Sequence, residues 1–304
     1  MMEKLVDAIS VSKPPVVLVA VDGPKADSAT DKEKVNRVQL CVERINWNSK
    51  VETRFRSSNI GLKASISDAV SWATSKYGSV VVIEDDLVPG PQMISYANFM
   101  IEKYRSETAI AHINLYNIVP SSSLQNVASH SRLTRFPESY CWATWGNSWI
   151  NYDDSLEWGL NCSIQELSKI TGSKIGALKW KMNFHDAASG RIQTWAYRWI
   201  ASMWSKGQYA IAPNSNLSSY TGSEDGTHTF RRQKFDELPV EFLKFEDPEV
   251  DDLEMNLDSF AEDYMAREVF GENFTGLLDG AVSTAIMELI RKKRAIGFAA
   301  RNVK

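Results

Sequence analysis

The first half of the chain alternates short apolar runs with amphipathic segments. Continuous or alternating apolar positions predict strands, whereas apolar positions three and four residues apart predict helices. The predicted strands are 16–21, 51–56, 79–83 and 110–113, and the predicted helices are 35–45, 62–77 and 94–104. Asp31 is a candidate cap for the first helix. This order predicts an α/β fold with a mainly parallel central sheet that helices flank on both faces.

The apolar pattern weakens in the second half. Residues 121–230 are rich in Trp, Ser, Asn and Gly, and we expect loops and helices there that complete the sheet and form a cleft. Residues 235–263 contain twelve acids and one base, Lys244, which is typical of a solvated linker. Residues 264–290 regain helical spacing, and the basic run Arg291–Arg294 follows. We predict a main domain over 1–232, with halves at about 1–120 and 121–232, and an acidic linker with a helical C-terminal extension over 233–304.

Composition narrows the class of protein. The 304 residues are 43% hydrophobic and 24% charged, which indicates a globular chain. The net charge of −4 argues against a general nucleic-acid binder. The three cysteines have no CxxC spacing, which excludes a disulfide framework and a cysteine-rich zinc site. No apolar run approaches the ~20 residues of a membrane span. We expect a cytoplasmic protein, at most peripherally associated with the inner face of a membrane.

Three consecutive acids, Glu84, Asp85 and Asp86, follow the strongest predicted strand. Carboxylates held together at a buried strand end repel one another, and this repulsion is unfavourable. A divalent cation or hydrogen-bond donors of a ligand would offset it. Hard oxygen ligands suit Mg²⁺ or Mn²⁺, and these ions commonly bridge phosphate oxygens. The alternative is that the acids solvate the strand end or cap the next helix.

The same predicted sheet edge carries further polar groups. Asp22 ends the first strand, and Asn59 and Gly61 follow the second, where a glycine lets backbone approach a phosphate at a helix N-terminus. Arg56 and Lys63 would add positive charge beside a diphosphate. The alternative is an ordinary strand-to-helix turn with solvated cations. Ligands of α/β sheets bind at the carboxyl ends of strands, so these residues predict a phosphate-bearing ligand there.

Several motifs, in this order, resemble glycosyltransferases of the GT-A type, which use nucleotide sugars. In particular, the chain is similar to N-acetylglucosaminyltransferase I and its bacterial relatives. It covers roughly residues 15–230, and its signature is an acidic Glu-Asp-Asp version of the DxD motif. The segments that carry it are SSNIGL (57–62), VVVIEDD (80–86) with PGP (89–91), RFPESYCWATWG (135–146), TWAYRW (194–199), IAPNSNL (211–217) and GTHT (226–229).

The resemblance implies a GT-A, Rossmann-like fold and a site that holds Mn²⁺ or Mg²⁺ with a donor, most simply a UDP-sugar. Its acceptor would be a glycan or a lipid-linked glycan. Carried over residue by residue, the resemblance implies that Asp86 and His228 would ligate the metal. Glu84 and Asp85 would hold the ribose, donor sugar or base. Asp22 would lie by the nucleobase, and Asn59 and Gly61 would line the nucleotide pocket.

The chain departs from the pattern of these glycosyltransferases at the position of the general base. Inverting relatives place a carboxylate in the block where this chain has Ala196 and Tyr197. Attack by an alcohol needs a proton acceptor, and a tyrosine with a pKa near 10 is a poor base. The candidates are Asp225 and Glu224 first, and also Asp186 and Glu138. The resemblance still implies inversion at the anomeric carbon.

Ten tryptophans are an unusual count, and six cluster in the second half. Indole faces stack on sugars, so we expect Trp142 or Trp145 to contact an acceptor sugar. Trp199 and Trp204, at helical spacing with Trp195, are expected in the core.

These features together predict a metal-dependent glycosyltransferase, with bacterial surface polysaccharide synthesis as the implied setting. One alternative is a sugar nucleotidyltransferase, which would carry a Gly-rich basic loop where this chain has Asp22–Lys25 (DGPK). Another is a non-catalytic nucleotide-sugar-binding protein, which the missing acid at Ala196 suggests.

Overall fold

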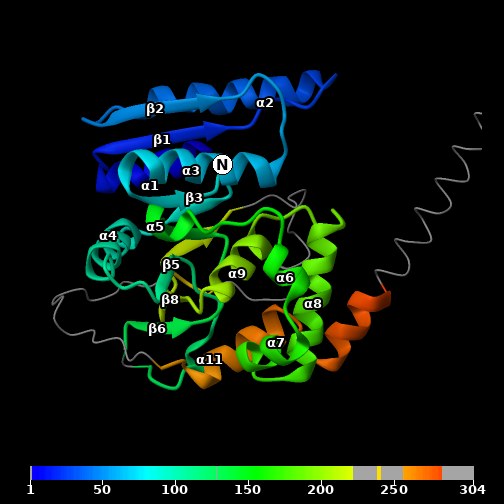
Figure 1. The fold of residues 1–304 in the computed structure, drawn as a ribbon. Helices are drawn as coiled ribbons and strands as arrows, with labels where there is room; N and C mark the ends of the chain where they lie inside the picture. The colour runs from blue at the N-terminus through cyan, green and yellow to red at the C-terminus, as the bar shows by residue number, and fades with distance from the viewer. Residues whose placement is uncertain (1, 128, 222–237, 241–255, 283–304) are drawn as a thin grey trace, which may run out of the picture.

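The computed structural model describes residues 2–127, 129–221, 238–240 and 256–282 (Figure 1). The strands are β1 Val16–Val21, β2 Lys50–Phe55, β3 Ser79–Ile83, β4 Leu87–Pro89, β5 Ile110–Asn114, β6 Ser131–Thr134, β7 Cys141–Trp145, β8 Tyr209–Pro213 and β9 Ser218–Tyr220. The helices are α1 Met2–Ser12, α2 Ala29–Leu40, α3 Leu62–Tyr77, α4 Met93–Lys103, α5 Gly146–Trp149, α6 Glu157–Asn161, α7 Ile164–Thr171, α8 Lys174–Ala188, α9 Ala196–Ser205 and α11 Ser259–Tyr264. Short turns of helix cover η1 Cys41–Arg44, η2 Ser121–Ser123 and η3 Met265–Val269, and residues 274–282 are also helical.

The central sheet is mixed. Its five strands lie in the order β3-β7-β5-β8-β6, and among them only β5 and β8 are parallel neighbours. β7 lies between β3 and β5 and runs antiparallel to both. β1 and β2 form a separate parallel pair, and β4 pairs with β9 antiparallel. The α/β class is confirmed, whereas the prediction of a mainly parallel sheet is corrected to a mixed, mainly antiparallel one.

The elements predicted in the first half are present, with one change at a helix start. Helix α2 begins at Ala29, and its cap is Ser28, whose hydroxyl accepts the Asp31 N–H (3.2 Å). The Asp31 carboxylate instead accepts the Lys25 N–H (2.6 Å). Helix α3 contacts both β1 and β3, so it holds the parallel pair beside the edge of the central sheet (Figure 1).

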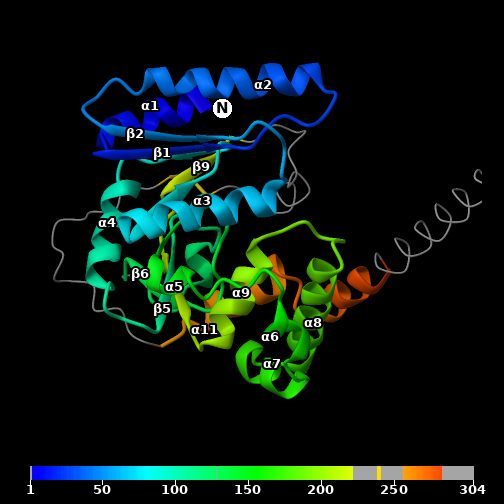
Figure 2. The same ribbon diagram turned by 45° about the horizontal axis from the view of Figure 1, so that its top comes forward.

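Two apolar cores position the site. The first lies between α4 and the central sheet and includes Met93, Tyr96 and Ile113. The second lies among α7, α8, α9 and α11, which group on one side of the molecule away from α1 and α2 (Figure 2). Trp204 belongs to the second core and Trp199 is 1% exposed, so the expectation that both are core residues is confirmed.

The described part of the C-terminal region packs into the second core rather than lying apart from it. Met265 and Phe270 are buried there. Two acids of the predicted solvated linker, Asp258 and Glu262, are also buried, and Glu262 lies 3.3 Å from the Arg135 guanidinium. The solvated-linker prediction is therefore wrong for this part, because the chain folds back onto the body; residues 241–255 lie outside the described ranges. Among the residues described, no helix is both long and apolar enough to span a membrane.

Candidate functional site

The chain turns sharply after β3, and the turn carries Glu84, Asp85 and Asp86. The Leu87 N–H donates to the Glu84 carbonyl (3.2 Å), and the chain returns as β4. The Asp86 carbonyl accepts from the backbone N–H (2.7 Å) and the hydroxyl (3.2 Å) of Thr221. The three acids are thus held on a hydrogen-bonded turn between the central sheet and the β4–β9 pair.

Two of these acids, Glu84 and Asp86, line a cavity of about 220 Å³, which we call the carboxylate pocket. Glu138 reaches it from the connection between β6 and β7, and Trp195 reaches it from the start of α9. The rest of the wall is mainly apolar and aromatic: Leu62, Ile118, Pro137, Ser139, Tyr140, Ile192, Thr194, Ala196, Tyr197, Ile200, Met265, Val269 and Phe270. Three acidic residues from two separate segments therefore line one apolar-walled cavity.

Two of the strand-end acids, Glu84 and Asp86, have raised pKa values. Burial, and then the charges of Asp86 and Asp85, raise the pKa of Glu84 to about 8, against a hydrogen bond from Trp195 that favours the charged form. Burial and then Asp85 raise the pKa of Asp86, and a hydrogen bond from Tyr220 opposes the change. Crowding of like charges in a partly dry site produces this behaviour.

Glu138 is the most deeply buried acid of the pocket. It is 5% exposed, and burial raises its pKa to about 8 although the Arg132 charge opposes the change. Its backbone N–H donates to Asn114 Oδ1 (2.9 Å), which fixes its place. Within the described ranges, neither Glu138 carboxyl oxygen has a hydrogen-bond partner, and the same is true of Asp86 Oδ1. Buried polar atoms are normally paired, so these three oxygens are positions where ordered water, a ligand or a cation would bind.

A pH dependence of stability follows from Glu84 and Glu138. Their folded pKa values are about 8, whereas unfolded glutamates titrate near 4.3, so the folded chain holds two protons that the unfolded chain releases. We expect the contribution of these two carboxyls to the free energy of unfolding to be greatest below about pH 4 and to fall as the pH rises towards 8, by up to about 1.4 kcal/mol per pH unit and carboxyl. Urea unfolding across this range measures the slope, and Glu138→Gln should flatten it. An equal slope in that variant would mean that the pKa of Glu138 is not raised.

The pocket offers the oxygen ligands of a hard cation, but the described residues alone do not form a complete metal site. Carboxylate oxygens suit Mg²⁺ and Mn²⁺. Nowhere in the described ranges do three potential ligand side chains come together for a metal. A cation at Asp86 would therefore need further oxygens from a ligand or water, or a side chain outside these ranges. The predicted ligand His228 and the predicted bases Asp225 and Glu224 all lie in 222–237, outside the described residues.

Asp22 anchors the loop that follows β2. Its carboxylate accepts four hydrogen bonds, from the N–H groups of Gly23 (2.8 Å), Ile60 (3.0 Å) and Gly61 (2.9 Å) and from Asn59 Nδ2 (3.0 Å). The structure thus brings Asp22, Asn59 and Gly61 together. The Asp22 carboxylate acts here on the protein's own loop, and the nucleotide-binding roles of these residues stay predictions.

Removal of this anchor should destabilise the fold. Asp22→Ala leaves four donors without their acceptor, and we expect a loss of about 2–3 kcal/mol in the free energy of unfolding, measured by urea denaturation. The matched control is Asp7→Ala, which breaks an exposed ion pair with Arg44 and should cost less than about 1 kcal/mol. Equal losses in the two variants would rule out the anchoring role.

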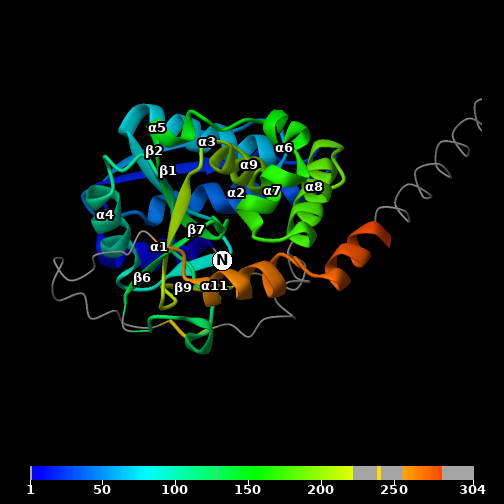
Figure 3. The ribbon, with the colours of Figure 1, turned by 60° about the horizontal axis from the view of Figure 1, so that its bottom comes forward.

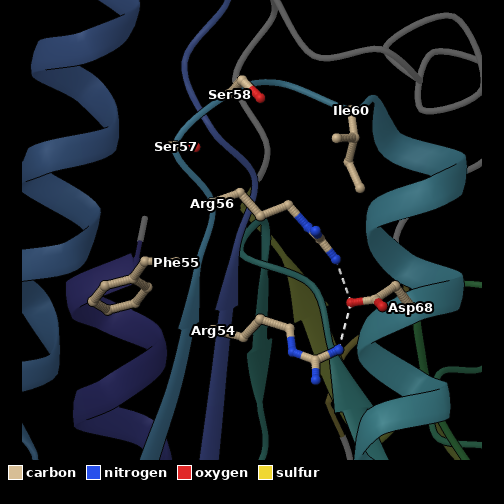
Figure 4. Close-up of a pocket in the computed structure, with 7 residues that line it drawn as sticks. All are labelled: Arg54, Phe55, Arg56, Ser57, Ser58, Ile60 and Asp68. Carbon is tan, nitrogen blue, oxygen red and sulfur yellow. Dashed lines mark hydrogen bonds and ion pairs between the residues drawn. The ribbon is translucent and has the colours of Figure 1, made fainter.

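The two basic side chains that the sequence analysis expected beside a diphosphate, Arg56 and Lys63, already pair with acidic side chains. Arg56 pairs with Asp68, and Arg54 Nη1 lies 2.6 Å from the same carboxylate oxygen (Figure 4). These three residues line a second depression, of about 470 Å³, and Arg56 is not among the residues of the carboxylate pocket. Lys63 Nζ lies 2.5 Å from Asp154. Both basic side chains are therefore paired with acids other than Glu84, Asp85 and Asp86.

Trp142 and Trp145 are both core residues. Trp142 is 0% exposed, and its ring stacks between His112 (5.0 Å) and Trp195 (4.8 Å). Trp145 is 4% exposed and donates its indole N–H to a backbone carbonyl of α4 (3.2 Å). Since β7 lies inside the sheet, neither ring offers a face to a glycan. The positions of these residues therefore speak against the predicted sugar contact, and Trp195 is the tryptophan that lines the pocket.

Of the two candidate bases that the structure describes, Glu138 and Asp186, Glu138 lines the carboxylate pocket. Asp186 instead pairs with Arg191 (2.7 Å). Ala196 and Tyr197 also line the pocket, and neither of them supplies a carboxylate. Sequence reasoning named Glu138 among the candidate bases but ranked Asp225 and Glu224 first, because the sequence pattern did not predict that β7 brings Glu138 to the strand-end acids.

The chain matches no protein-family model, and a search of curated proteins finds no significant match.

Proposed function

We propose that the protein is a metal-dependent glycosyltransferase of the GT-A type, which moves a sugar from a nucleoside-diphosphate sugar to a hydroxyl of a glycan or lipid-linked acceptor. The observation that carries this proposal is the carboxylate pocket, where Glu84 and Asp86 at a strand end meet Glu138. The parallel β1–β2 pair beside a mixed sheet is compatible with a GT-A fold. The motif resemblance over 15–230 supports the same reaction, and we propose surface polysaccharide synthesis in the bacterial cytoplasm as its setting.

The strand-end acids would bind the donor. Asp86 would hold Mn²⁺ or Mg²⁺, because a cation removes the cost of its buried, unpaired oxygen. When bound, such an ion stabilises the charge that builds on a leaving diphosphate. Glu84, oriented by Trp195, would bind a hydroxyl of the ribose or sugar. Asp22 and its loop would border the nucleoside.

Glu138 would take the proton of the attacking hydroxyl. A general base works best when its pKa is close to the working pH, and burial raises the pKa of Glu138 to about 8. Its free oxygens have no competing partner in the described structure. The apolar wall limits water, which favours transfer to the acceptor over hydrolysis. A single displacement with one base inverts the anomeric carbon. Asp225 and Glu224 remain candidates for this role if Glu138 is dispensable.

A thermal-shift screen against UDP- and GDP-sugars, with and without Mn²⁺, followed by a transfer assay, tests the proposal. One nucleotide sugar should raise the melting temperature by about 5 °C, and only with the metal present, because ligand binding stabilises the folded state. The same donor should then release its nucleotide when an acceptor is supplied. Binding without transfer or hydrolysis would indicate a non-catalytic binding protein, and no shift with any donor would contradict the site itself.

A further inference from the structure

Two arginines of β2 converge on one carboxylate of α3. Arg54 and Arg56 lie on the same face of the strand, because side chains alternate along it. Arg54 Nη1 donates to Asp68 Oδ2 (2.6 Å), and Arg56 donates to the same oxygen (Figure 4). Among the described residues, neither guanidinium has another hydrogen-bond partner. A guanidinium carries five N–H donors, so most of these donors remain available to a ligand.

The hollow of about 470 Å³ that Arg54, Arg56 and Asp68 line, which we call the arginine depression, carries a net positive charge. Its charged residues are two bases and one acid, which leaves one positive charge. The nearest acids are already engaged. Glu52, on the same face of β2, pairs with two lysines, and Asp22 accepts four hydrogen bonds within its own loop. The excess charge is therefore available to an anion.

The groups around this charge are held on a fixed framework. The Arg54 guanidinium lies 4.6 Å from the centre of the Trp72 ring, a contact that favours one orientation of its plane. Ser57 and Ser58 line the depression from the loop after β2. This loop packs directly on the end of β1, since a Cβ added to Gly23 would lie 2.3 Å from the Ser58 carbonyl carbon. Hydroxyl and guanidinium donors therefore border one preformed hollow.

The arginine depression is separate from the carboxylate pocket. Ile60 lines the former, Leu62 lines the latter, and their lining residues do not overlap. Figure 1 and Figure 3 place the β1–β2 pair at the end of the molecule opposite α11, the helix that precedes the pocket wall of Met265 and Phe270. A ligand of the arginine depression is therefore distinct from one bound at the strand-end acids.

We propose that the arginine depression binds the phosphate group of a small phosphorylated molecule. Guanidinium groups match phosphate oxygens, which accept paired N–H bonds. Asp68 offers one negative charge to two arginines, and a phosphate monoester offers the second. The hollow is much larger than a phosphate group, and the exposed Ile60 gives an apolar contact for the organic part of the ligand. This inference does not rest on the proposed reaction.

Other anions fit the depression less well. A nucleic acid is held by a row of positive charges, whereas the neighbouring Lys63 and Lys76 of α3 pair with acids. A free phosphate ion would fill only part of the hollow and leave Ile60 in water. A phosphate monoester uses both the charge and the apolar edge.

Calorimetric titration of the full chain with phenyl phosphate and with inorganic phosphate, at low salt and without divalent metal, tests this site. Phenyl phosphate should bind more tightly than inorganic phosphate, because its ring contacts Ile60. Arg54→Gln/Arg56→Gln should lose about tenfold in affinity or more, since hydrogen bonds to charged groups are the strong ones. Asp68→Asn should gain about threefold or more, because it removes the acid that competes for both guanidinium groups. A merely structural ion pair would give no such gain.

The matched control is Arg44→Gln, which removes an exposed guanidinium paired with Asp7 and should bind phenyl phosphate as the wild type does. Melting temperatures verify that each variant is folded, and added salt should weaken binding. Wild-type protein that binds neither phosphate, equal losses in the depression and control variants, or a folded Asp68→Asn without a gain would overturn the proposal. Equal affinity for the two phosphates would overturn the organic ligand. A loss in Asp86→Asn but not in Arg54→Gln/Arg56→Gln would place the phosphate in the carboxylate pocket and overturn the separate site.

Discussion

Glu138→Gln is expected to lower kcat for sugar transfer by about 10²–10⁴, with little change in donor binding. The amide keeps the size of the side chain but accepts no proton at neutral pH. The buried carboxyl, whose pKa is about 8, is largely protonated in the resting protein at pH 7, so a neutral amide should not disturb the fold. The wild-type rate should rise as the pH approaches 8, when the carboxylate forms.

Initial rates of nucleotide release with acceptor present measure this effect, and donor titrations separate kcat from KM. The matched control is Glu102→Gln on α4, which removes an exposed acid that pairs with Arg105. It should leave kcat unchanged. Transfer at the wild-type rate in Glu138→Gln would move the base to another residue, and Asp225 and Glu224 would be tested next.

Asp86→Asn is expected to weaken metal-dependent nucleotide binding by about 100-fold or more, because the amide cannot offer the charged oxygen that a hard cation needs. Removal of the Asp86 charge should also lower the pKa of Glu84, since Asp86 is one of the groups that raise it. The fold should therefore tolerate the change.

Calorimetric titration of UDP into the wild type and the variant, each with and without Mn²⁺, measures the loss. Without metal the two proteins should bind equally weakly. With metal only the wild type, and the Glu102→Gln control, should gain affinity. A variant that keeps the full gain would show that Asp86 does not hold the cation.

Most elements of the first half were predictable because their signals are local, and α1 and β4 are the ones that were not predicted. The continuous apolar run of β3 and the acids that follow it are adjacent in the sequence, so both the strand and its polar end could be identified. Four strands of the second half were missed. The fully buried β7 has no alternation of apolar and polar residues, and its place between β3 and β5 depends on pairing with distant segments.

The same long-range pairing limited the prediction of the site. Glu138 belongs to the pocket because β7 enters the sheet beside β3 and brings the preceding connection to the strand-end acids. The same insertion buries Trp142, whose ring by itself suits a sugar contact or a core equally well. The wall formed by Met265 and Phe270 depends on a segment that the sequence pattern assigned to an extension.

The central claim is that Asp86 binds the cation on which a nucleoside diphosphate lies. A crystal structure of the protein with Mn²⁺ and UDP, with anomalous diffraction to locate the metal, tests it most directly. The account predicts a manganese peak in direct contact with the Asp86 carboxylate and a diphosphate oxygen, with Glu138 across the pocket. A peak at other residues, or a nucleotide seated in the depression of Arg54 and Arg56 with the carboxylate pocket empty, would contradict it.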